Sequence, residues 1–450
     1  MARQLFGTDG IRGVAGEFPL DPQTAYAFGV ALGEWAKSHA QGPEVLIGMD
    51  TRESGSWLAG NVAAGLRTGG VGVRFAGLIT TPGVAYLTRT LHFVAGVMIS
   101  ASHNPYQDNG IKVFDHSGFK LPDEQEHALE ERIFALLKSD VQPAAELVNV
   151  DEALDETYID YLVSTVSKRL DGMSLVIDCA HGASSHLAPE LFERLGATVR
   201  AIGCSPDGKN INLDCGALHV ANLRDKVLEV GADAGVAFDG DADRAILVSR
   251  AGKIIDGDNV LLIAATTLHR EGRLGGPNGE PTVVATVMSN LGLEIALAEH
   301  GIRLLRTPVG DKYVLEEMIR SGSVLGGEQS GHVIFREYAT TGDGLLTALR
   351  ILAIMRSSGL DLDELTRNLN IYPQLLVNVR VKTRRPLQEL IEVQNEIRTA
   401  EESFGTTGRV LVRFSGTEPL ARVMVEGPDL ERVERFANRI AGAIRNELGS

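Results

Sequence analysis

Three aspartates alternate along a short segment, D-G-D-A-D-R, at Asp239, Asp241 and Asp243. The apolar run A-G-V-A-F comes directly before them, so the carboxylates should follow a buried strand. Carboxylates this close together repel one another unless a cation neutralises them. Magnesium fits such a group, because it takes oxygen ligands and usually shares them with a phosphate. A solvated acidic turn or a calcium loop is the alternative, but the segment lacks the twelve-residue spacing of an EF-hand.

A second polar segment, I-S-A-S-H-N-P-Y-Q-D-N-G-I-K, provides Ser102, His103 and Lys112 after another apolar run. Serine, asparagine and proline after a strand are ordinarily turn formers. Beside a carboxylate metal site, however, a phosphorylated serine could donate its phosphoryl group, because a bound ion can hold one phosphate oxygen and polarise the phosphorus. The two segments together therefore indicate phosphoryl transfer, which depends on in-line positioning and charge neutralisation.

Two further segments contain groups that suit a phosphorylated sugar. The segment R-F-S-G-T-E-P-L-A-R suits a phosphate dianion, because Arg offers paired donors and glycine allows a close approach; its polar and glycine residues are Arg413, Ser415, Gly416, Thr417 and Arg422. A solvated strand edge is the alternative. The segment G-G-E-Q-S-G-H offers donors and acceptors for sugar hydroxyls at Glu328, Ser330 and His332, although alone it is uninformative.

An apolar strand followed by Asp-x-Asp has a second interpretation. It resembles the nucleophile motif of the haloacid dehalogenase phosphatases. In that interpretation Asp239 would form an aspartyl-phosphate, and the protein would be a hydrolase.

The elements that must position these groups form three similar units. Each unit has an apolar strand, a helix with apolar residues four positions apart, a glycine at a left-handed C-cap and a second strand; the units begin at residues 45, 175 and 282. Such βαβ units build mostly parallel sheets, and either common ancestry or chance similarity could explain the repetition. A further apolar run and a polar segment follow each unit. Because ligands bind beyond the carboxyl ends of strands, these three polar segments should meet in one cleft.

This organisation predicts an α/β protein. We expect three tandem related α/β domains with mixed, mostly parallel sheets, plus a smaller C-terminal α+β domain. The expected boundaries are 1–150, 151–252, 253–366 and 367–450. In the last domain we expect strands over 375–382 and 409–414, helices over 387–402 and 430–448, and the phosphate-binding segment in a loop over 413–422.

The composition restricts the kinds of molecule that the protein is expected to bind. A formal net charge of −16 over 450 residues would repel nucleic acid and anionic membranes, so an anionic substrate needs a local basic pocket. The three cysteines lack a C-x-x-C pattern, which argues against a disulfide framework or a zinc site. The N-terminal residues M-A-R-Q-L-F-G-T-D-G lack the apolar run of a secretory signal, and we expect a cytoplasmic location.

Taken together, the segments resemble the α-D-phosphohexomutase superfamily from end to end, and most closely the bacterial phosphoglucosamine mutases. F-G-T-D-G-I-R-G near the N-terminus resembles the opening motif of that branch. S-A-S-H-N-P resembles its phosphoserine loop, D-G-D-A-D-R its magnesium loop, G-E-Q-S-G-H its sugar loop and R-F-S-G-T-E-P its phosphate loop. All of them occur in the order of the family.

The resemblance implies a role for each site residue. Ser102 would be the phosphorylated nucleophile, and one Mg²⁺ would be held by Ser102, Asp239, Asp241 and Asp243. Arg244 would stabilise the transferring group, Glu328 and Ser330 would contact the sugar, and the C-terminal phosphate loop would bind the other phosphate through Arg413, Ser415, Gly416, Thr417 and Arg422. The candidates for acid/base and charge-stabilising roles are Arg12, His103, Lys112 and His332.

The implied reaction interconverts glucosamine 6-phosphate and glucosamine 1-phosphate. Glucosamine 1,6-bisphosphate would be the intermediate and activator, and the product would feed UDP-N-acetylglucosamine and cell-wall precursor synthesis. The expected partner is a small phosphosugar, with no nucleic acid and no membrane, and the resemblance allows a homodimer. A phosphomannomutase or phosphoglucomutase, the Asp239 phosphatase, and a phosphosugar-binding regulator without activity remain as alternatives.

Overall fold

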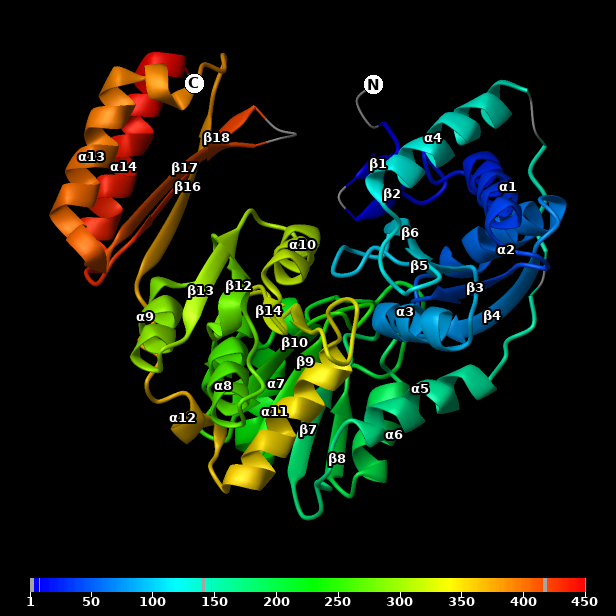
Figure 1. Cartoon of the computed structure of the whole chain (residues 1–450), viewed down its shortest axis with the longest axis horizontal. Helices are drawn as coiled ribbons and strands as arrows, with labels where there is room; N and C mark the ends of the chain where they lie inside the picture. Colours follow the sequence, from blue (N-terminus) through cyan, green and yellow to red (C-terminus); the bar gives the residue numbers. More distant parts are fainter. Residues whose placement is uncertain (1–3, 8, 140–141, 147, 416–418, 450) are drawn as a thin grey trace. The chain divides into compact units, whose positions relative to one another are not determined.

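The structure is a computed structural model, and it describes residues 4–7, 9–139, 142–146, 148–415 and 419–449. The chain divides into two compact units. The first consists of Met1–Met288 and Leu304–Thr366, and the second of Ser289–Arg303 and Arg367–Ser450. Figure 1 shows the elements of both units, which are described separately below. Among the described residues, no helix is long and apolar enough to cross a membrane.

Three mixed sheets organise the first unit. The six-stranded sheet has the order β1-β2-β6-β5-β3-β4, with β1 Phe6–Gly7, β2 Gly10–Val14, β3 Glu44–Met49, β4 Gly72–Leu78, β5 Ala95–Ile99 and β6 Asp108–Asp115. The five-stranded sheet has the order β11-β10-β9-β7-β8, with β7 Ser174–Asp178, β8 Thr198–Ile202, β9 Ala234–Phe238, β10 Ala245–Ser249 and β11 Ile254–Ile255. The four-stranded sheet has the order β13-β12-β14-β15, with β12 Thr282–Thr286, β13 Arg303–Thr307, β14 Leu325–Gly327 and β15 Val333–Phe335.

The three sheets repeat one strand order. In the first, β3 pairs in parallel with β4 and β5, and β6 is added antiparallel to β5. In the second, β7 pairs in parallel with β8 and β9, and β10 is added antiparallel to β9. The third sheet has β12 between β13 and β14, with β15 antiparallel to β14. The prediction of three related α/β domains with mixed sheets is therefore confirmed, and in the first two sheets the parallel pairs lie at the end formed by β4 and β8.

The turn between the third and fourth strand of each repeat carries one predicted site segment. Ser102 lies between β5 and β6, the aspartates lie between β9 and β10, and Glu328 lies between β14 and β15. Strands β5, β9 and β12 are buried along their whole length, which fits their mostly apolar sequences. The glycines that follow the helix of each unit, Gly70, Gly196 and Gly301, have a positive φ, as predicted.

Helices of the first unit begin at side-chain caps or polar turns. Asp21, Thr80, Asp256 and Asp343 each accept a hydrogen bond from a backbone N–H in the first turn. The helices are α1 Pro22–His39, α2 Gly55–Thr68, α3 Thr81–Thr90, α4 Asp123–Lys138, α5 Ala153–Ser164, α6 Leu187–Arg194, α7 Ala221–Val230, α8 Gly257–Arg270, α10 Asp311–Ser321, α11 Gly344–Ser358 and α12 Leu362–Leu365. Short 3₁₀ turns occur at Gly216–Leu218 and Pro277–Gly279.

The second unit is a three-stranded antiparallel sheet with helices α13 and α14 on it (Figure 1). Its elements are α9 Leu291–Glu299, β16 Gln374–Arg380, α13 Ile391–Phe404, β17 Arg409–Phe414, β18 Leu420–Glu426 and α14 Leu430–Leu448, with 3₁₀ turns at Leu387–Glu389 and Gly405–Thr407. The strand predicted over 409–414 is confirmed as β17, which includes Arg413. The predicted loop over 413–422 is wrong at its C-terminal end, because Arg422 belongs to β18, whose apolar residues are buried in the small core.

Candidate active site

The three aspartates form a buried carboxylate group directly after β9. One oxygen from each of Asp239, Asp241 and Asp243 lies within 4.8 Å of the others, and the residues are 0%, 0% and 8% exposed. Burial and the charges of Asp243 and Asp241 raise the pKa of Asp239 well above its ordinary value. The Oδ1 atoms of Asp241 and Asp243 are buried without a hydrogen-bond partner. Unsatisfied carboxylate oxygens of this kind fit a hard divalent cation.

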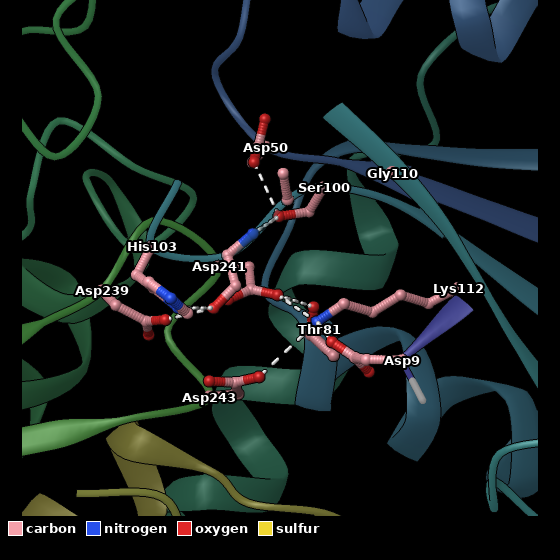
Figure 2. Close-up of polar contacts among 12 residues, drawn as sticks. Asp9, Asp50, Thr81, Ser100, His103, Gly110, Lys112, Asp239, Asp241 and Asp243 are labelled. Atoms are coloured by element: carbon pink, nitrogen blue, oxygen red, sulfur yellow. Dashed lines mark hydrogen bonds and ion pairs between the residues drawn. The ribbon is translucent and has the colours of Figure 1, made fainter. Parts of the chain in front are cut away.

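Lys112 on β6 is the nearest cation to this group. Its Nζ lies 2.8 Å from Asp241 Oδ2 and 3.6 Å from Asp243 Oδ2, and its side chain is 2% exposed (Figure 2). Burial alone would lower the pKa of Lys112, but the carboxylates of Asp241, Asp9 and Asp243 outweigh it and raise that pKa. Thr81 at the start of α3 donates to the same Asp241 oxygen at 2.5 Å. The carboxylate group is therefore held by two elements of the first repeat.

Ser102 lies against the carboxylate group. Its hydroxyl donates to Asp239 Oδ2 at 2.6 Å, and the residue is 2% exposed with a positive φ of 54°. His103 Nδ1 lies 3.4 Å from the same hydroxyl. Burial and the charges of Arg244 and Arg12 lower the pKa of His103 to about 4, so the imidazole is neutral near pH 7.

Two arginines lie beside the serine. Arg12 donates to the Ala101 carbonyl at 3.3 Å and to Asp9 Oδ2 at 2.5 Å. Arg244 Nε lies 4.0 Å from Asp239 Oδ2 and 3.8 Å from Asp243 Oδ1. Burial would lower the pKa of Arg244, but the charges of Asp239 and Asp243 outweigh it and raise that pKa. Both guanidinium groups line the same cavity as Ser102, where they can neutralise a phosphate.

The loop after β14 supplies the opposite wall of this cavity, which has a volume of about 410 Å³. Glu328 and His332 line it, and Glu328 Oε1 accepts from the Gly310 N–H at 3.1 Å. His332 is 4% exposed, and neither of its ring nitrogens has a hydrogen-bond partner. Ser330 is exposed, and it is not among the described residues that form the cavity wall.

The sequence reasoning missed three charged residues as site residues: Asp9 and Asp311 line the cavity, and Lys120 pairs with both of them. Lys120 Nζ lies 2.5 Å from Asp9 Oδ1 and 2.5 Å from Asp311 Oδ2, and thereby links the first repeat to the start of α10 in the third. Burial would raise the pKa of Asp9, but Lys112, Lys120 and Arg12 hold it well below its ordinary range. Asp9 lies inside the quoted motif F-G-T-D-G-I-R-G, which was a signal, whereas no local pattern marked Lys120 or Asp311.

The phosphate segment belongs to the second unit. Arg413 and Arg422 are directly opposite each other on β17 and β18, and Ser415 is buried at the end of β17. Burial and the charge of Arg422 lower the pKa of Arg413. Gly416 and Thr417 lie outside the described residues. Two guanidinium groups on adjacent strands make a concentration of positive charge that suits an anion.

Four family models match consecutive parts of the chain. They are described as Phosphoglucomutase/phosphomannomutase alpha/beta/alpha domain I at residues 3–140, domain II at 156–252, domain III at 256–372 and the C-terminal domain at 376–443. The chain belongs to this phosphoglucomutase/phosphomannomutase family, the α-D-phosphohexomutases. The domain boundaries given above stay predictions.

Comparisons with individual proteins of the family add to the match with the family models. The chain is 62% identical over 449 residues to the phosphoglucosamine mutase of Solibacter usitatus, with 100% of each chain covered. It is 48% identical to the phosphoglucosamine mutase of Koribacter versatilis, covering 99% of this chain and 98% of that one. A solved phosphoglucomutase/phosphomannomutase family protein of Burkholderia thailandensis superposes with a TM-score of 0.78 at 25% identity, covering 98% of this chain and 97% of that one. The predicted superfamily and the predicted isomerase class are confirmed.

Proposed function

We propose that this protein interconverts glucosamine 6-phosphate and glucosamine 1-phosphate through phosphorylated Ser102. The observation that carries the proposal is the 2.6 Å hydrogen bond from the Ser102 hydroxyl to Asp239 Oδ2. Among the described residues that line the cavity, Ser102 is the only serine or threonine. The hydrogen bond places its hydroxyl at the edge of the group of three carboxylates. The names of the relatives with 62% and 48% identity support the glucosamine substrate.

The first transfer phosphorylates the sugar. The bond from phosphorus to Ser102 Oγ breaks, a bond to O1 of glucosamine 6-phosphate forms, and the proton of the O1 hydroxyl ends on Ser102 Oγ. Arg12, Arg244 and Lys112 lie around Ser102 and stabilise the charge on the phosphoryl oxygens. The resulting 1,6-bisphosphate reorients, and Ser102 then takes the 6-phosphate by the reverse steps.

Asp239, Asp241 and Asp243, with the phosphate on Ser102, would hold one Mg²⁺. The buried and unpartnered oxygens of Asp241 and Asp243 support this assignment. When bound, the ion would act as a Lewis acid on the phosphoryl group. Lys112 remains paired with Asp241 and keeps that carboxylate ionised.

His332 is our candidate for exchanging a proton with the sugar hydroxyl. It is buried, it lines the cavity with Ser102, and both ring nitrogens are without a hydrogen-bond partner. Glu328 in the same loop has one oxygen engaged by the Gly310 N–H and is positioned to accept from a sugar hydroxyl. Ser330 stays a predicted sugar contact.

The second unit would bind the phosphate that is not reacting. Arg413 and Arg422 are the main candidates, with Ser415, Gly416 and Thr417 supplying hydroxyl and backbone donors. A phosphate site on a separate unit suits a bisphosphate that must turn, because either end can occupy it in turn.

Replacing Ser102 by Ala tests the proposal. We expect the variant to lose mutase turnover and to show no mass increase of one phosphate after incubation with glucosamine 1,6-bisphosphate and magnesium. Retained phosphate hydrolysis in the variant would support the Asp239 phosphatase instead. Rates on glucosamine, glucose and mannose 6-phosphates would test the substrate, and equal rates would overturn the glucosamine assignment.

A further inference from the structure

The backbone at Ser102 has a conformation that residues with side chains rarely adopt. Its φ of 54° lies in the left-handed region, which is unfavourable for a residue with a Cβ. Such a conformation persists only where the surroundings hold it in place. The contacts that hold it therefore determine where the Ser102 hydroxyl points.

The N–H side of Ser102 is held from the end of β3. Asp50 Oδ2 accepts a hydrogen bond from the Ser100 hydroxyl at 2.7 Å, and Ser100 Oγ accepts from the Ser102 N–H at 2.9 Å (Figure 2). Asp50 is fully buried, and burial raises its pKa although the charge of Arg52 opposes this effect. The orientation of this peptide group is thus fixed by a buried chain of side chains.

The carbonyl side is held by a buried guanidinium. Arg52 donates through Nη2 to the Ser102 carbonyl at 2.9 Å and to the Asn104 carbonyl at 2.8 Å. Its Nη1 donates to the carbonyls of Pro105 and Asp108, and its Nε lies 2.9 Å from Asp50 Oδ2. One fully buried side chain therefore donates hydrogen bonds to four carbonyl oxygens between Ser102 and Asp108.

A second donor comes from the second repeat. Asn212 Nδ2 donates to the Ser102 carbonyl at 2.9 Å and to the Asn104 carbonyl at 3.2 Å, which are the two carbonyls that Arg52 Nη2 also contacts. Gly240 of the aspartate loop lies beside them, and a Cβ there would come within 2.6 Å of the Ser102 carbonyl oxygen. Only glycine allows the aspartate loop to approach the serine loop this closely.

We propose that Arg52 and Asn212 are positioning residues for phosphoryl transfer. They hold the Ser102 and Asn104 carbonyls from two different repeats, and so fix the Ser102 hydroxyl against Asp239. Neither side chain is among the residues that line the cavity. Their effect is on the placement of the nucleophile, where a shift of about 1 Å costs on the order of a hundredfold in rate. The inference rests on the proposed role of Ser102.

Asn212→Gly is the decisive variant. Asn212 has a φ of 59°, which glycine adopts freely, so the change removes the two donated hydrogen bonds without straining the backbone. Asp214→Gly is the matched control, because Asp214 is exposed, lies two residues away and has a φ of 52°. Arg52→Lys keeps the charge beside Asp50 but lacks the fork that reaches four carbonyls.

The experiment follows phosphorylation of Ser102 by glucosamine 1,6-bisphosphate with magnesium, using rapid quenching and intact-mass measurement, together with kcat, KM and thermal unfolding. For Asn212→Gly we expect the loading rate and kcat to fall about 10- to 100-fold, with little change in KM or in the unfolding midpoint relative to Asp214→Gly. Arg52→Lys should lose at least as much kcat.

The outcomes separate this inference from the proposed function. If the wild-type protein takes no phosphate on Ser102, the proposed function fails and the inference fails with it. If the wild-type protein is loaded and Asn212→Gly is loaded at the rate of Asp214→Gly, only the positioning role is overturned. A loss of kcat that merely follows a lower unfolding midpoint would also overturn it, because that result indicates a structural role.

Discussion

Lys112 Nζ lies 2.8 Å from Asp241 Oδ2, and both side chains are shielded from solvent. The pair joins the first repeat to the second at the point where a cation would bind. Burial would raise the pKa of Asp241, but the charge of Lys112 and its hydrogen bond outweigh burial and lower that pKa. Lys112 thus compensates part of the negative charge of the carboxylate group in the absence of a metal ion.

Lys112→Met should therefore destabilise the metal-free protein. Removing one partner of a buried pair leaves an uncompensated charge and costs about 3 to 5 kcal/mol. Urea unfolding in the presence of a chelator measures the loss, and Lys112→Arg, which keeps the charge, should lose less. Added Mg²⁺ should stabilise Lys112→Met more than wild type, because the ion replaces the missing positive charge. Equal stability of the Met variant and wild type under chelation would contradict this account.

Lys120→Met should weaken substrate binding. Without this cation, Asp9 and Asp311 lose their shared partner, and their repulsion should displace the loops on both sides of the cavity. We expect KM for glucosamine 6-phosphate to rise about tenfold, which corresponds to about 1.4 kcal/mol. Steady-state kinetics measure the change. Lys312→Met removes a partly exposed pair with Asp123 of α4 from α10, the helix that also contains Asp311, and serves as the control, for which KM should stay near wild type.

The contrast between these residues shows what could be predicted from the sequence. Ser102 and the three aspartates were identifiable because each lies in a short motif directly after an apolar strand. Lys120, Asp311 and Asn212 were not, because they reach the site only through the packing of one repeat on another. Arg52 was not identifiable either, because it follows a different strand, β3, from the serine loop that it contacts. The strand β18 was missed because its first residues were assigned to the phosphate loop, although Ala421, Val423 and Val425 recur at every second position, as in a strand.

Arg413→Ala and Arg422→Ala should each raise KM more than they lower kcat. A hydrogen bond to a charged group contributes about 1.5 to 3 kcal/mol, so each loss should raise KM about 10- to 100-fold. In the proposed function these residues would bind the phosphate that is not reacting, so the chemical step should be affected less. Arg398→Ala in the same unit is the control, because Arg398 is exposed and hydrogen-bonds only within α13. An unchanged KM in both variants would show that these two arginines of the second unit do not contribute to substrate binding.

Asp343 allows the pH dependence of stability to be tested at a residue outside the carboxylate group of Asp239, Asp241 and Asp243. Its Oδ1 caps α11 by accepting from the Leu346 N–H at 2.9 Å, and its Oδ2 accepts from the Tyr158 hydroxyl at 2.8 Å. Burial raises the pKa of Asp343 to about 6, against hydrogen bonds that lower it. The unfolded chain has a pKa near 4 at this position. Between these values the folded state binds more protons than the unfolded state, so this group makes stability fall as the pH rises from about 4 to about 6.

Asp343→Asn removes the ionisation and keeps an oxygen for the helix cap. The two pKa values differ by about 2, which corresponds to about 3 kcal/mol, so the variant should gain up to about that much over wild type at pH 8. At pH 4 the gain should largely disappear, because Asp343 is then protonated in the folded state. Asp361→Asn, the same substitution at the exposed N-cap of α12, is the matched control. Urea unfolding at pH 4, 6 and 8 measures both differences. A pH-independent effect of Asp343→Asn would show that the pKa of the Asp343 carboxyl is not raised.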